Sequence, residues 1–222
     1  MAGTNGEVKV SVNAGQFTDL VGNASTEAGS LSLSVDTIAP TVAITSDASG
    51  LKAGATATLS FTFSEPPATV PNVTPVLGTA SGSASDAGAL SALSRVGGSN
   101  VYTATYTPPV GQAGGKVGFL IGNWGDAAGN VGLTGAAPLI EIDTVAPTVT
   151  AVASDSVIKG PYSMGFARPD TTLDLTFSEV PAGLPTLTAN LTGVTVSALP
   201  VLGGNGAPTN KVSYSLSVPV GL

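Results

Sequence analysis

The sequence contains no cysteine and no histidine. Without cysteine the chain has no disulfides and no thiolate metal ligands. Without histidine it lacks the commonest general base and the commonest zinc ligand in proteins. A catalytic triad that depends on either residue is therefore excluded, and no nucleophile-elbow motif accompanies the abundant serines. We expect a protein that is not an enzyme.

Charge is also scarce, because charged residues make up only 9% of the chain and the net charge is −7. Nucleic-acid binding needs clustered basic residues, and the seven lysines and arginines are scattered. No apolar run approaches the roughly 20 residues of a membrane span. Neither nucleic-acid binding nor membrane insertion is predicted. Residues 1–7 have no basic or apolar region of the kind found in signal peptides, so we expect any export signal to lie outside this chain.

Aromatic residues make up only 5% of the sequence, whereas there are 29 glycines and 16 prolines. Hydrophobic residues still reach 42%. Cores built from valine, leucine and a few phenylalanines, with many turns between short strands, are typical of β-sandwiches. A length of 222 residues indicates about two domains.

The sequence contains an internal repeat. Four motifs recur in the same cyclic order, and Asp143 lies 107 residues after Asp36. Such order does not arise by chance, and periods of this kind indicate repeated structural units. The paired motifs are DTIAPTV at 36–42 with DTVAPTV at 143–149, TFSE at 62–65 with TFSE at 176–179, PVG at 109–111 with PVG at 219–221, and DLVGN at 19–23 with DAAGN at 126–130.

The repeat predicts three segments. Residues 37–143 form a complete unit. Residues 1–36 correspond to the C-terminal strands of a unit, and residues 144–222 correspond to the N-terminal part of a unit without its last two strands. The chain is therefore predicted to consist of the end of one unit, one complete unit and the beginning of a third.

Large and hydroxyl side chains alternate along several short segments, which places the large ones inward from a β-strand. Glycine and proline separate these segments, and none shows helical periodicity. The pattern predicts an all-β fold of tandem Ig-like β-sandwiches with about seven strands each and partial units at both ends. The predicted strands of the complete unit include 40–46, 57–64, 116–122 and 137–143, and another holds Tyr102, Ala104 and Tyr106.

Together, the Asp-Thr-x-Ala-Pro-Thr-Val, Phe-Ser-Glu and Asp-x-x-Gly-Asn motifs resemble the bacterial Ig-like tandem repeats of large surface adhesins and biofilm-associated proteins. The resemblance covers nearly the whole chain. It implies an extracellular, cell-surface location, a stalk of stacked sandwiches, and calcium at the joints. It does not imply a ligand. One departure is Trp124-Gly125, where the first segment has Phe17-Thr18.

The direction of successive strands predicts a cluster of acidic residues at one pole of the complete unit. The first strand runs away from Asp36, the second returns and delivers Glu65 to the same pole, and the loop between the last two strands brings Asp126 and Asn130 there. Three carboxylates and an amide oxygen are hard ligands suited to weak Ca²⁺ binding. Turn chemistry alone is the alternative, because Asp-Ala-Ala-Gly-Asn is also a good turn sequence.

The repeat predicts the same set of residues twice more, in incomplete form. Asp143 and Glu179 belong to the last segment, which ends before its own Asp-x-x-Gly-Asn loop. Asp19 and Asn23 supply that loop in the first segment. These four residues are candidate calcium ligands on the same reasoning.

The expected partners are other copies or neighbouring repeats of the same protein. A unit without its last two strands leaves open sheet edges, which pair with any strand that is offered. Residues 1–36 of another copy contain the missing strands, and head-to-tail completion would build a filament. The alternative is a fragment of a longer array.

Two classes of function remain open. The first is a structural or adhesive extracellular repeat, as either a stalk spacer or a filament subunit. The second is a carbohydrate-binding or accessory module of a secreted enzyme, in which Trp124 contacts a surface glycan from the pole of the unit. A tryptophan packed in the core is the alternative role for Trp124.

Overall fold

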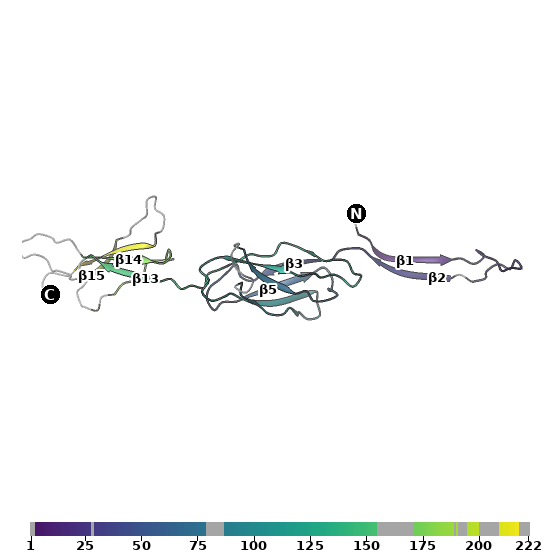
Figure 1. Cartoon of the computed structure of the whole chain (residues 1–222), viewed down its shortest axis with the longest axis horizontal. Coiled ribbons are helices and arrows are strands. Elements are labelled where there is room, and N and C mark those ends of the chain that lie inside the picture. Colours follow the sequence, from purple (N-terminus) through teal and green to yellow (C-terminus); the bar gives the residue numbers. More distant parts are fainter. Residues whose placement is uncertain are drawn as a thin grey trace, which may run out of the picture. The chain divides into compact units, whose positions relative to one another are not determined.

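The computed structural model describes residues 3–27, 29–78, 87–154, 171–188, 190, 195–199 and 209–217. Every helix or strand among them is a β-strand, which confirms the all-β prediction. The described residues contain no helix that could cross a membrane. The chain divides into two compact units, Met1–Val145 and Ala146–Leu222, and each is described by itself (Figure 1).

The first unit begins with a β-hairpin of β1 (Asn5–Val12) and β2 (Gly29–Asp36), labelled in Figure 1. The two strands pair antiparallel, with Val8 opposite Leu33 and Val10 opposite Leu31. Because side chains alternate between the faces of a strand, these residues share one apolar face, and serines and charged residues occupy the other. The hairpin forms a two-stranded sheet of its own.

The rest of the first unit is a sandwich of two sheets. One sheet has the order β11-β3-β5-β9-β7, with β8 also paired to β9, and the other has the order β4-β12-β10-β6. The strands are β3 (Thr41–Ser46), β4 (Gly50–Leu51), β5 (Ala57–Phe63), β6 (Val73–Leu77), β7 (Ala89–Leu90), β8 (Ser94–Arg95), β9 (Val101–Thr107), β10 (Lys116–Ile121), β11 (Leu133–Thr134) and β12 (Ile140–Ile142).

The core of the sandwich is built from the inward positions of both sheets. Leu59, Phe61 and Phe63 of β5 are buried, as their alternation with hydroxyl residues predicts. Edge-to-face aromatic pairs lie in the core, Phe63 with Tyr102 within one sheet and Tyr106 with Phe119 between the two sheets. Such pairs add about 0.5–1.5 kcal/mol to the burial of the rings. The remaining core residues include Val42, Ile44, Ala104, Val117, Ile140 and Ile142.

The second unit contains one described sheet of four strands, with the order β13-β14-β16-β15. Its registers repeat those of the first unit, because Val149 lies opposite Phe177 as Val42 lies opposite Phe63. Its buried cluster consists of Leu175, Val212 and Tyr214. The strands are β13 (Val149–Ala153), β14 (Thr171–Phe177), β15 (Thr195–Leu199) and β16 (Lys211–Ser217). The PVG motif at 219–221 lies outside the described residues.

Candidate metal site at one pole of the complete unit

Three carboxylates meet at the pole where the chain passes from the hairpin into the sandwich. Asp36 ends β2, Glu65 follows the end of β5, and Asp126 lies in the loop after β10. Each offers one carboxylate oxygen, and these oxygens all lie within 4.8 Å of one another. Strand β5 returns to the pole where β3 begins, so strand direction accounts for this convergence. Three hard oxygen donors at this spacing fit a calcium ion.

The Asp126–Asn130 loop is held by its own hydrogen bonds. The carboxylate of Asp126 accepts the backbone N–H of Asn130 at 2.8 Å and the side-chain Nδ2 of Asn130 at 2.8 Å. Gly129 takes a positive φ of 93°, a conformation that favours glycine. The turn chemistry of this loop is therefore present together with the carboxylate cluster, and the two interpretations of the motif are compatible.

Asn130 fixes the cluster through its amide nitrogen. Nδ2 donates both to Asp126 and, at 3.2 Å, to the backbone carbonyl of Asp36. This side chain joins two of the three acidic positions, although they are 90 residues apart. The sequence predicts Asn130 as a fourth oxygen ligand, and the contacts of its Nδ2 show that it also positions Asp126.

The hairpin carries the same loop in the same conformation. Asp19 accepts the backbone N–H of Asn23 at 2.8 Å and its Nδ2 at 2.7 Å. Gly22 has a φ of 94°, as the corresponding Gly129 does at 93°. Among the residues that the structure describes, the loop at 19–23 has no acidic group around it, whereas the loop at 126–130 contributes Asp126 to the cluster.

Two carboxyl groups of the cluster have pKa values shifted in opposite directions. Desolvation first, and then the charges of Asp126 and Asp36, raise the pKa of Glu65. The side-chain hydrogen bond from Asn130 lowers the pKa of Asp126, although burial opposes it. Asp126 is therefore held as a carboxylate, and Glu65 is the carboxyl group whose ionisation is disfavoured. A bound cation would relieve this repulsion.

A serine clamp positions Glu65, and sequence reasoning did not identify it. Ser64 Oγ accepts the backbone N–H of Thr41 at 2.9 Å, and the N–H of Ser64 donates to the carbonyl of Thr41 at 2.9 Å. The second unit repeats both bonds between Ser178 and Thr148. The recurrence of Phe-Ser-Glu in the sequence was the signal that could have identified this clamp. In this motif Phe packs in the core, Ser binds the first strand, and Glu lies at the pole.

Asp143 and Glu179, the corresponding pair of the second repeat, lie in different compact units. The carboxylate of Asp143 accepts the backbone N–H of Val145 at 3.1 Å, as that of Asp36 accepts the N–H of Ile38 at 3.0 Å. The local turn at the start of each unit is therefore the same. The triad of Asp36, Glu65 and Asp126 is the acidic group that the described residues bring together.

Trp124 is a core residue. Its side chain is 6% exposed and packs edge-to-face on Phe63, with ring centroids 5.0 Å apart. A Cβ at Gly132 would overlap the indole ring, so glycine is needed there. Glycan binding through Trp124 would require this ring to be uncovered.

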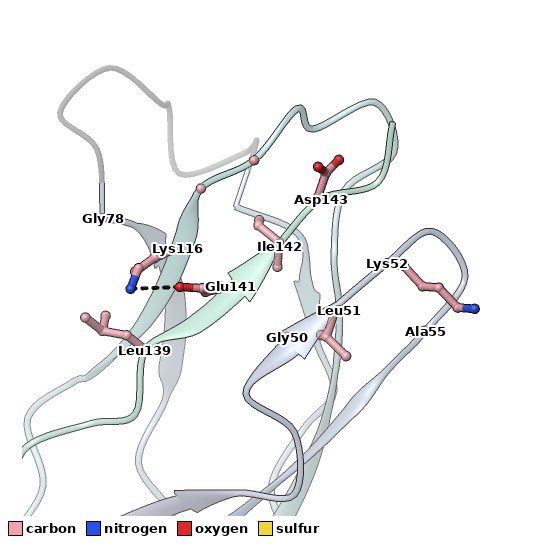
Figure 2. A pocket seen from close by; sticks show the side chains of 12 residues that line it. Gly50, Leu51, Lys52, Ala55, Gly78, Lys116, Leu139, Glu141, Ile142 and Asp143 are labelled. Carbon is pink, nitrogen blue, oxygen red and sulfur yellow. Dashed lines mark ion pairs between the residues drawn. The ribbon is translucent and has the colours of Figure 1, made fainter. Parts of the chain in front are cut away.

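A recess of about 940 Å³ lies at the other pole of the sandwich, where the chain leaves β12. Leu51, Leu139 and Ile142 contribute apolar walls. Figure 2 shows the ion pair between Lys116 and Glu141, 3.0 Å long, on one side of the recess. Both partners of this pair are largely exposed, so the pair adds little to stability.

The sandwich is similar to a known family of domains. Residues 36–140 match a family described as a bacterial Ig-like domain. No curated protein sequence matches the chain. Among solved structures, the chain is similar to the adhesin InvE of Yersinia pseudotuberculosis, with 12% identity and a TM-score of 0.33, over 81% of this chain and 52% of that one. The chain thus spans about half the length of that structure.

Proposed function

We propose that this chain is an extracellular structural or adhesive segment of a bacterial surface protein. The observation that carries the proposal is the repetition of structural contacts from one unit to the next. The serine clamp, the turn at the first aspartate and the strand registers of the bacterial Ig-like domain recur in the second unit. Repeated units that contact their neighbours build extended molecules.

The proposed role within that protein is to join units head to tail. A stalk spacer and a filament subunit both satisfy this description. The apolar face of the hairpin is exposed on the first unit, and either form would have to cover it. An isolated two-stranded hairpin is marginally stable in water, so a face of this kind needs a cover.

Calcium is proposed as the ion that stiffens the pole of the complete unit. Asp36, Glu65 and Asp126 would hold it, and its positive charge would offset the repulsion that raises the pKa of Glu65. Extracellular calcium modules have dissociation constants on the order of 10⁻⁴–10⁻³ M. An ion at this position would tie the end of β2 to the sandwich, because Asp36 belongs to β2.

Surface labelling tests the proposed location. An antibody raised against residues 37–143 should label intact cells that make the protein, and brief external protease should remove the signal. An antibody to a cytoplasmic protein serves as the control and should label only permeabilised cells. Labelling by the first antibody that also requires permeabilisation would contradict an extracellular role.

A further inference from the structure

The strands that begin the complete unit lie beside the strands that end it, and they run parallel. Strand β11 pairs parallel with β3, and strand β12 pairs parallel with β4. The other described strand pairs of the sandwich are antiparallel. Strands β3 and β4 come first in the unit, and β11 and β12 come last. The two ends of the unit are therefore bonded directly to each other.

Backbone hydrogen bonds join these parallel strands in both sheets. Their lengths are those of ordinary N–H to carbonyl bonds. The bonds run from the N–H of Leu133 to the carbonyl of Pro40 (2.7 Å), from Gly135 to Val42 (3.2 Å), from Glu141 to Ser49 (2.9 Å) and from Asp143 to Leu51 (3.0 Å).

Tension along the chain would act on these bonds along the strands. The chain continues on both sides of the complete unit, so tension would enter at Asp36 and leave at Val145. It would draw the start of β3 back toward the pole of the acidic triad, and it would draw the end of β12 out of the opposite pole. Because the paired strands run parallel, this motion slides them past each other along their own axes. All of the bonds between them then resist the tension together.

A pull across the strands has a different effect. It would break the bond between Leu133 and Pro40 first, and the remaining bonds one after another. A single backbone hydrogen bond contributes little net free energy, so bonds that break in turn resist weakly. The unit should therefore resist tension along the chain better than it resists a pull from the side.

A threonine lies just beyond the parallel strands and holds the chain that leaves them. Thr144 is 8% exposed, and its N–H donates to the carbonyl of Gln112 at 2.7 Å. Its Oγ1 accepts the N–H of Gln112 at 2.8 Å and donates to the carbonyl of Pro109 at 2.8 Å. These bonds, the threonine bracket, tie the residue after Asp143 to the loop between β9 and β10. Tension that leaves the unit must break the bracket before it reaches β12.

The same bracket occurs one repeat earlier. The N–H of Thr37 donates to the carbonyl of Thr4 at 2.9 Å, and the Oγ1 of Thr37 accepts the N–H of Thr4 at 2.7 Å. Thr37 and Thr144 both follow the aspartate of the Asp-Thr-x-Ala-Pro motif. The bracket is therefore a feature of the repeat, and it lies where a strand passes into a link.

We propose that the complete unit is a force-bearing module that resists tension along the chain. The parallel pairs of β3 with β11 and of β4 with β12 resist this tension by shear, and the bracket at Thr144 protects β12. The inference rests on the proposed structural or adhesive function, and it adds the direction of the force that the unit withstands.

Pulling single molecules in two directions tests the proposal. The sequence has no cysteine, so thiol-linked handles attach only at introduced positions. Ile38→Cys/Val145→Cys places the handles in the two links, one repeat apart, and pulls along the strands. Ile38→Cys/Val131→Cys places both handles at the pole of the acidic triad, because Val131 follows Asn130, which contacts Asp36, and this pair pulls across the strands. The side chains of Ile38, Val131 and Val145 are all exposed.

The full chain should unfold at different forces in the two directions. Without divalent cations, the mean unfolding force should be at least about twofold higher for the 38/145 pair than for the 38/131 pair, because forced unfolding follows the barrier to unfolding. The event is recognised by its length, since the 107 residues between the first handles extend to roughly 350–390 Å. Equal forces in the two directions, or a higher force for the 38/131 pair, would overturn the proposal.

Thr144→Val tests the bracket, because it keeps the shape of the side chain and removes both bonds of its hydroxyl group. With the 38/145 handles, the variant should unfold about fivefold faster at a fixed force, the effect of about one lost hydrogen bond. With the 38/131 handles its rate should not change, because that pull acts at the other pole. Thr62→Val, at an exposed position of β5, is the matched control and should behave as the parent in both directions. An equal acceleration by Thr144→Val in both directions would show that the bracket stabilises the fold without bearing force.

Surface labelling of cells distinguishes this inference from the proposed function. A protein that labels intact cells but unfolds at equal forces in both directions would overturn the force-bearing role and leave the extracellular role intact. A protein that resists tension along the chain but is labelled only after permeabilisation would overturn the proposed function, and with it the tension that the unit is proposed to bear.

Discussion

The acidic side chains at the pole of the complete unit differ in how their ionisation affects the stability of the fold. The pKa of Asp126 is lowered, so its hydrogen-bonded carboxylate stabilises the fold above its ordinary pKa, and that stability is lost as the pH falls through the lowered value. Glu65 behaves in the opposite way. Its pKa is raised, so its ionisation opposes folding as the pH rises through the raised value.

Glu65→Gln separates these effects. Without divalent cations, the variant should melt at a higher temperature than the parent at neutral pH, because one repelling charge is removed. The difference should shrink as the pH falls below the raised pKa of Glu65, where the parent side chain is protonated. Melting curves at several pH values measure it, and a gain that persists at acid pH would contradict the electrostatic cause.

The same variant tests the calcium proposal. About 10 mM Ca²⁺ should stabilise the parent by about 1–3 kcal/mol, given a dissociation constant on the order of 10⁻⁴–10⁻³ M. Glu65→Gln should lose most of this gain. Glu141→Gln, at the other pole, is the matched control and should keep it. Equal calcium responses in both variants would exclude the triad as the binding site.

The sequence predicts the longer strands of the complete unit well. The predicted strand at 40–46 is β3, that at 57–64 is β5, and that at 116–122 is β10, each within a few residues. Strict alternation of large and hydroxyl residues makes these strands easy to predict from the sequence. The two-residue strands β4, β7, β8 and β11 could not be predicted, because their pairing depends on a partner elsewhere in the fold.

The sequence likewise predicts only part of the candidate site. Strand direction alone is sufficient to place Asp36, Glu65 and Asp126 at one pole. It cannot say which atom of Asn130 faces the carboxylates, because that depends on the exact path of the loop. Nor does it identify Ser64 as a clamp, because serine is common at outward strand positions in this chain.

Gly132→Ala tests how the loop element packs on the core. A Cβ at this position overlaps the ring of Trp124, so the ring must shift against Phe63. Overpacking of this kind costs about 1–3 kcal/mol, measurable as a lower denaturant midpoint. Gly6→Ala is the matched control, because a Cβ there meets nothing within 4 Å. Equal midpoints for the two variants would show that Trp124 has room to move.

At the scale of the whole molecule, the serine clamp of the first unit recurs in the second. Ser178 and Thr148 form the same pair of hydrogen bonds in the second unit as Ser64 and Thr41 form in the first. In each unit these bonds tie the first strand to the second, as the strand registers show. Each clamp should therefore stabilise its own unit.

Ser64→Ala should therefore destabilise the complete unit by about 1 kcal/mol, because the N–H of Thr41 loses its acceptor. The fluorescence of Trp124, the one tryptophan of the sequence, reports on this unit during denaturant unfolding, and its midpoint should fall. Ser178→Ala is the matched control, because it removes the equivalent bond from the second unit and should leave the Trp124 midpoint unchanged. Equal shifts of the Trp124 midpoint in both variants would mean that the two units unfold together.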